Sequence, residues 1–127
     1  MFEALGIRMG PFKDGWIIAD IEKVIEEDKA EDLLYVPIVI SMDSPDYEWS
    51  EKICISLSSH ENFNVRGNAI LGFGHLARIS GKLNLTKVLP IVSNALSDKN
   101  DYVRGQAQDA ADDIKHYLKT NVPTNDT

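Results

Sequence analysis

The residues best suited to nucleophilic or metal chemistry are a single cysteine and three histidines. Cys54 lies inside an apolar run, where a buried small hydrophobe is the expected role, and a lone cysteine rules out an internal disulfide. His60, His75 and His116 share no metal-ligand spacing with one another or with Cys54. We therefore predict that the chain binds no metal.

Hydrolytic and phosphate-transfer chemistry find equally little support. Asp112 and Asp113 are adjacent, so on a helix they would not face each other as a catalytic carboxylate pair. No serine lies within a visible Ser/His/Asp pattern. Gly72 and Gly74 fall inside a predicted helix, where they favour close helix packing and not a phosphate loop. We predict that the protein is not an enzyme and uses no cofactor.

The charge balance narrows the choice of partner. The 127 residues include 20 acidic and 13 basic side chains, for a net charge of −7. Neutralising phosphates requires an excess of lysine and arginine, so nucleic acid and anionic membrane surfaces are poor partners. A basic protein would suit this charge, although solubility alone also explains it. With no signal peptide and no apolar stretch long enough for a bilayer, we expect a cytoplasmic chain that is monomeric before binding.

The elements that would position a binding surface come from an internal repeat. Residues 61–69 match residues 99–107 at an offset of 38 positions. The identical pairs are Asn62/Asn100, Val65/Val103, Arg66/Arg104, Gly67/Gly105 and Ala69/Ala107. A period of this length is typical of stacked helix pairs.

Each copy of the repeat predicts two helices. Apolar spacing in the later copy predicts helices over residues 85–96 and about 102–118, with Pro90 near the start of the first. The earlier copy predicts helices over residues 49–57 and 62–79, and Gly81 is the expected C-cap. The constant offset predicts that the two second helices run nearly parallel.

The N-terminal third repeats less clearly. Ile17, Ile18, Ile21, Val24 and Ile25 form an amphipathic helical stripe. Residues 33–42 are almost continuously apolar and contain Pro37, which fits either a buried kinked helix or a buried strand. The repeat favours the helix, in a degenerate first copy that would cap the stack.

Several residues of the last copy resemble the HEAT-repeat consensus: Val88-Leu-Pro-Ile-Val92, Ala95-Leu96, Asp98, Val103-Arg104 and Ala107. The match is good over about 84–118, weaker over 49–80, where His60 occupies the position of Asp98, and poor before residue 45. In that family the aspartate and arginine bond to each other and to turn backbone. The resemblance therefore implies a structural role for Asp98, Arg104 and Arg66.

The resemblance implies an all-α fold: a short α-solenoid of about three HEAT-like helix pairs, the first degenerate. The whole chain, 1–127, would be a single domain. Its parts would be an irregular N-terminal arm (1–15), a degenerate repeat (16–43), two clear repeats (46–80 and 84–118) and a flexible tail (119–127).

The chain also resembles small bacterial HEAT-type proteins, some of which are immunity proteins in contact-dependent growth inhibition. That likeness implies a protein-binding inhibitor that covers the active site of a basic nuclease toxin. The alternative is a HEAT-type adaptor that joins two other proteins without inhibiting either. Neighbouring genes would discriminate, since an immunity gene should directly follow the gene of a large secreted toxin.

Two surfaces are candidates for binding that partner. One is the exposed row of the second helices, the concave side of such a stack; an ordinary solvated face is the alternative. Its candidate residues are Asn68, Leu71, His75, Gln106, Asp109 and Asp113. The other is an acidic, aromatic turn, where Trp49 alternatively anchors the next helix and Asp46 caps it. Its candidate residues are Asp43, Asp46, Tyr47, Glu48 and Trp49.

Overall fold

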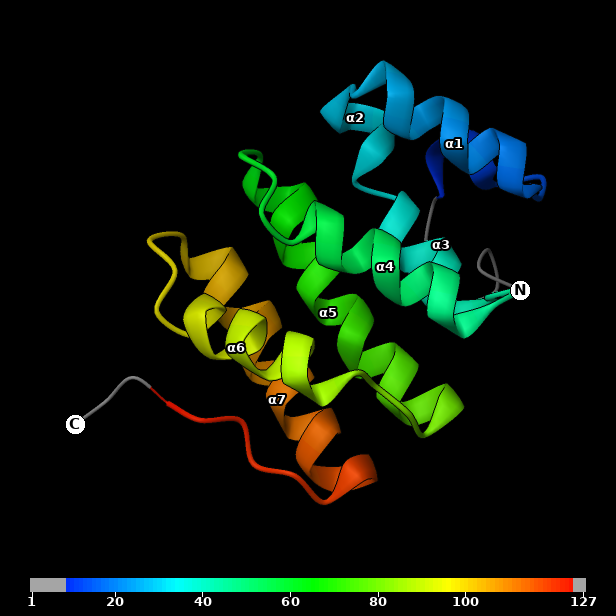
Figure 1. The fold of residues 1–127 in the computed structure, drawn as a ribbon. Helices are drawn as coiled ribbons and strands as arrows, with labels where there is room; N and C mark the ends of the chain where they lie inside the picture. The colour runs from blue at the N-terminus through cyan, green and yellow to red at the C-terminus, as the bar shows by residue number, and fades with distance from the viewer. Residues whose placement is uncertain (1–8, 125–127) are drawn as a thin grey trace.

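A computed structural model describes residues 9–124, and all regular structure in this range is helical. This confirms the all-α prediction. After a 3-10 turn, η2 (Gly10–Phe12), the helices are α1 (Ile18–Glu27), α2 (Ala30–Leu33), α3 (Val36–Met42), α4 (Tyr47–Leu57), α5 (Phe63–Ser80), α6 (Leu85–Ala95) and α7 (Asp101–Leu118) (Figure 1).

The two clear copies fold as the helix pairs α4–α5 and α6–α7. Asn62 and Asn100, an identical pair of the repeat, cap α5 and α7, because each side-chain oxygen accepts backbone N–H bonds from the first helical turn. Gly81 ends α5 with a φ of 70°, a left-handed conformation that glycine adopts without a steric penalty. The predicted C-cap at Gly81 is therefore confirmed.

Helix α5 lies at the centre of the molecule, packed between α3 and α7 (Figure 1). A Cβ at Gly67 would meet the Tyr102 ring at 2.9 Å, and one at Gly74 would meet the Ala110 Cα at 3.1 Å. These contacts advance together along both helices, so α5 and α7 run in the same direction, as the repeat predicted. Small residues on α5 permit this close packing.

The N-terminal third is helical, but its apolar run is divided. Helix α2 ends at Leu33 and α3 begins at Val36, so residues 33–42 form neither a strand nor one kinked helix. Pro37 falls in the first turn of α3, where the missing N–H costs no helical hydrogen bond.

The two ends of the chain contribute more to the core than the sequence indicated. Met9 and Phe12 are almost fully buried, so the described part of the expected irregular arm helps to fill the core. Residues 119–124 form no regular element, yet Val122 packs against the core. Residues 1–8 and 125–127, the rest of the predicted arm and tail, lie outside the described range.

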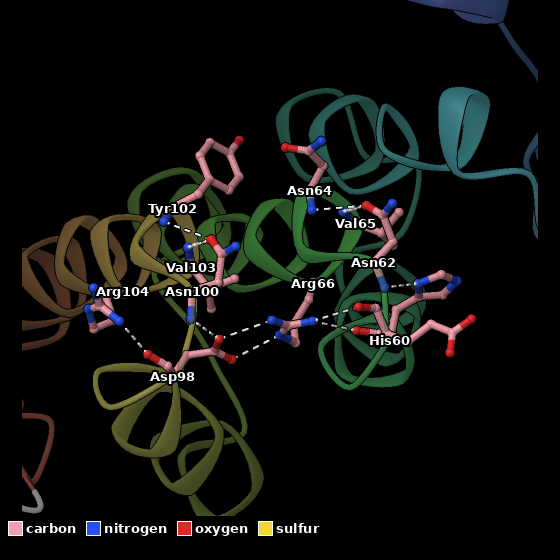
Figure 2. Close-up of polar contacts among 11 residues, drawn as sticks. His60, Asn62, Asn64, Val65, Arg66, Asp98, Asn100, Tyr102, Val103 and Arg104 are labelled. Atoms are coloured by element: carbon pink, nitrogen blue, oxygen red, sulfur yellow. Dashed lines mark hydrogen bonds and ion pairs between the residues drawn. The ribbon is translucent and has the colours of Figure 1, made fainter.

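The turns between helices are joined by a chain of polar contacts (Figure 2). Arg66 donates to both carboxylate oxygens of Asp98 at 2.9 Å, and its other terminal nitrogen donates to the His60 and Glu61 carbonyl oxygens at 3.0 Å. Arg104 donates to the Asp98 carbonyl oxygen at 2.7 Å. Through these contacts, Arg66 and Asp98 join two successive turns.

One detail of the implied pairing is wrong. The expected bond between the carboxylate of Asp98 and Arg104 is not made; the carboxylate bonds to Arg66 of the preceding copy instead. Stacking of the two pairs brings Arg66 beside Asp98 and leaves Arg104 exposed, in contact with the Asp98 main chain.

His60 replaces the aspartate in the preceding turn. Its Nδ1 accepts the Asn62 backbone N–H, so the ring proton is on Nε2, which donates to the Asp28 carboxylate at 2.8 Å. The contacts therefore run from the α1–α2 turn to the α6–α7 turn, through Asp28, His60, Arg66, Asp98 and Arg104.

Candidate functional site

The first candidate surface is the shared face of α5 and α7, and part of it is committed to internal contacts. Asn68 is buried: its amide nitrogen donates to the Leu34 carbonyl oxygen at 2.9 Å, and its amide oxygen accepts from the Tyr102 hydroxyl and from Gln106. The prediction that Asn68 lies in an exposed row is therefore wrong. This side chain ties α5 to α7 and to the segment before α3.

Further along the same face lie ionisable side chains that are partly buried. The Asp113 side chain lies over Gly74, and burial together with Asp109 and Asp112 raises the pKa of its carboxyl group although Arg78 opposes the shift. Burial, and then the positive charge of Arg78, lower the pKa of His75 to about 4. His75 is therefore neutral at physiological pH.

The exposed part of this face includes a carboxylate and two aromatic rings. Asp109 is exposed and Leu71 is half-buried. Phe63 and Tyr102 stand at the start of α5 and α7 with their ring centroids 6.0 Å apart, and both are about two-fifths exposed. Exposed carboxylates on this face are therefore few.

The second candidate surface is the turn before α4. Asp46 caps this helix by accepting the Glu48 and Trp49 backbone N–H groups at 3.0 and 3.2 Å. Trp49 is half-buried and stacks on Trp16, with ring centroids 6.4 Å apart. The structural alternative is therefore confirmed for Asp46 and Trp49, whereas Asp43, Tyr47 and Glu48 are exposed.

This turn forms one wall of an open groove of about 600 Å³. Residues 43–45 of the turn line that wall, and residues 16–19, which lead into the start of α1, line the other. Ile17 is 67% exposed and Ile18 41%, so these two residues do not belong to the buried stripe that the sequence predicted for α1. Ile21 and Val24 alone are fully buried on that helix. The groove is the feature that sequence reasoning missed.

The acidic charge is concentrated in the third of the chain that forms this groove. Residues 9–51 contain twelve acidic and three basic side chains, whereas residues 52–124 contain six acidic and nine basic ones. The negative charge is therefore not spread evenly: residues 9–51 are strongly acidic, whereas residues 52–124 carry a small excess of basic side chains. Counting charges by segment would have revealed this from the sequence.

Reactive chemistry has no evident place in the described range. Burial, and then the neighbouring Glu51, raise the pKa of the Cys54 thiol to about 12, which keeps it protonated and unreactive. Among residues 9–124, no three His, Cys, Asp or Glu side chains gather where they could hold a metal ion. No helix in that range is long and apolar enough to cross a membrane. No known protein family, curated protein or solved structure matches this chain.

Proposed function

We propose that this chain is an immunity-type inhibitor that binds a basic nuclease toxin domain and covers its active site. In this proposal the helix pairs form a short HEAT-like α-solenoid that acts in the cytoplasm. The observation that carries the proposal is the acidic segment, residues 9–51, with a partly apolar groove in its surface. An exposed apolar patch with a charged rim is a common form of protein-binding site.

The mechanism would be electrostatic and steric. A nuclease holds phosphates in a cationic groove, and carboxylates from residues 9–51 would occupy that groove in their place. Rigid helices would hold those carboxylates in position, so little conformational entropy would be lost on binding. The inhibitor would need no chemical step of its own, in keeping with the protonated thiol of Cys54.

The decisive experiment is a protection assay. The C-terminal domain of any large secreted protein encoded directly before this gene is produced in cells with and without the chain. We expect growth only when both are present, and nuclease activity that falls to zero at one inhibitor per toxin domain. Failure of the chain to bind this domain, or binding without inhibition, would contradict the proposal.

Charge reversal then tests which surface is used. Asp43→Lys with Glu48→Lys alters the acidic turn, and Asp109→Lys with Asp112→Lys alters α7; all four side chains are exposed. Because both double variants change the net charge equally, long-range attraction falls by a similar amount in each. We expect the first pair to weaken toxin binding at least about tenfold more than the second.

An adaptor remains the second candidate, and one observation favours it. The exposed Phe63–Tyr102 pair lies on the α5–α7 face, away from the groove between α1 and the turn before α4. Two separate apolar surfaces would let one chain join two proteins. A stable three-protein complex, in which Tyr102→Ser and Ile17→Ser each release a different partner, would favour the adaptor over the inhibitor.

A further inference from the structure

The groove is lined by apolar side chains together with the polar side chains of Asp43 and Ser44. Trp16 and the two exposed isoleucines line one side, and Pro45 lines the other. Burying an isoleucine against a partner removes apolar surface from water, which is the main favourable term in protein association. At about 600 Å³, the groove has room for one or two large apolar side chains of a partner.

Carboxylates surround this apolar surface. Asp43 lines the groove and makes no side-chain hydrogen bond with any residue in the described range. Asp20 bonds to the backbone N–H of Ile17 at 2.8 Å, and Asp46 caps α4 beside Pro45. A negative rim disfavours an acidic ligand and attracts a cationic one.

We propose that the groove receives a large apolar side chain of a protein partner whose neighbouring residues are lysine or arginine. The proposal rests on the proposed function, because it specifies the recognition element that the basic partner would present. The apolar side chain would fill the space between Trp16, Ile17 and Pro45. The flanking cations would reach Asp43 and the other acidic side chains of the rim.

The chain carries a built-in reporter for this site. It contains two tryptophans, Trp16 and Trp49; Trp16 lines the groove and stacks on Trp49. A ligand that enters the groove changes the surroundings of Trp16 directly. Intrinsic tryptophan fluorescence therefore reports groove occupancy without a label, and a ligand bound to the α5–α7 face leaves it unchanged.

The test uses a random peptide library selected on the full chain, followed by fluorescence titration of the selected peptides. We expect the selected peptides to share a leucine, isoleucine, phenylalanine or methionine flanked by lysine or arginine. Ile17→Ser and Asp43→Asn should each weaken binding about tenfold, since both remove an exposed contact in the groove. The matched controls are Ile79→Ser, an isoleucine 38% exposed at the end of α5, and Glu61→Gln, an exposed acid in another turn.

Several results would overturn the proposal. These are an empty selection, selected peptides that are acidic or lack an apolar residue, and equal losses in the test and control variants. A dimer in sedimentation that Ile17→Ser dissociates would assign the groove to a second copy of the chain instead. Peptide binding without toxin protection would reject the proposed function and leave the groove assignment intact. Protection without peptide binding would do the reverse.

Discussion

Arg66 is the side chain that joins the two clear copies of the repeat. The side chains of Arg66 and Asp98 are only 12% and 15% exposed, respectively. Each guanidinium nitrogen of Arg66 has a hydrogen-bond acceptor. Arg104, its counterpart in the later copy, makes one side-chain bond to a carbonyl oxygen and is exposed. Equivalent positions in the two copies of the repeat therefore make different contacts in the structure.

We predict that Arg66→Ala lowers the free energy of unfolding by about 1.5–3 kcal/mol, because hydrogen bonds to a charged, largely buried partner are lost. Arg104→Ala should cost no more than about 1 kcal/mol, since one exposed bond is removed. Urea denaturation of the two variants measures both values. Equal losses would show that the Arg66–Asp98 pair contributes nothing beyond the turn contacts.

His75 predicts a pH dependence of stability. Burial lowers its folded-state pKa to about 4, below the usual value near 6.5. Above pH 6.5, His75 is neutral in both the folded and the unfolded chain, so its ionisation does not change the stability there. Between about pH 6.5 and pH 4 the unfolded chain takes up a proton that the folded chain does not, which destabilises the fold by up to about 3 kcal/mol.

The check is urea denaturation across that pH range for the wild type, His75→Gln and His116→Gln. We expect His75→Gln to remove this part of the stability loss. His116→Gln is the control, because His116 is exposed. Parallel pH curves for the wild type and His75→Gln would mean that His75 is protonated freely in the folded protein.

At the scale of elements, two glycines of α5 lie so close to neighbouring elements that there is little room for a Cβ. A Cβ at Gly74 would come within 3.1 Å of the α7 backbone, and one at Gly72 would lie 2.8 Å from the Cys54 sulfur. Gly105 of α7, in contrast, has no atom within 4 Å of the position that a Cβ would occupy. The same residue type is thus required in one helix and dispensable in the other.

We predict opposite signs for one substitution at these two places. Gly74→Ala should destabilise the fold by about 1–3 kcal/mol through overpacking against α7. Gly105→Ala should stabilise it by about 0.5–1 kcal/mol, because alanine favours the helix and meets no neighbour. Thermal denaturation decides the matter: a stabilised Gly74→Ala would mean that α7 shifts away at little cost.

The helices of the clear repeats were predictable because their ends carry local signals. Asn62, Asn100 and Gly81 mark those ends in the sequence, and α5 and α7 begin and end within a residue of prediction. Residues 33–42 carry no such signal, so their division into two helices was not predictable. In the sequence, Ile17 and Ile18 look like core residues. Helical spacing shows which side chains share a face, but it does not show where the neighbouring element ends and leaves some of them exposed.

At the scale of the whole molecule, one continuous core runs from Met9 in the first turn to Ile114 in α7. Both tryptophans lie near its N-terminal end, whereas far-UV circular dichroism follows every helix. We predict one unfolding transition with the same midpoint by both probes. An earlier change in fluorescence would show that α1 and its neighbours unfold before the rest.

The choice of Asp98 partner was likewise beyond the sequence, for a reason that belongs to the whole molecule. Both arginines stand at equivalent repeat positions, and only the stacking of successive pairs places Arg66, rather than Arg104, beside the carboxylate. The charge asymmetry, by contrast, is fully contained in the sequence. What the sequence lacks is the knowledge that the start of α1 and the turn before α4 enclose a groove between them.

The contacts that join the turns also bear on errors of assembly. Repeat proteins misfold characteristically when one repeat takes the place of another. Here the α1–α2 turn offers the carboxylate Asp28 to a histidine, and the α4–α5 turn offers Arg66 to the carboxylate Asp98. If the last turn stacked directly on the first, Asp28 would oppose Asp98, and two carboxylates at hydrogen-bonding distance repel. The charges on these turns therefore disfavour an arrangement in which the last turn packs directly on the first.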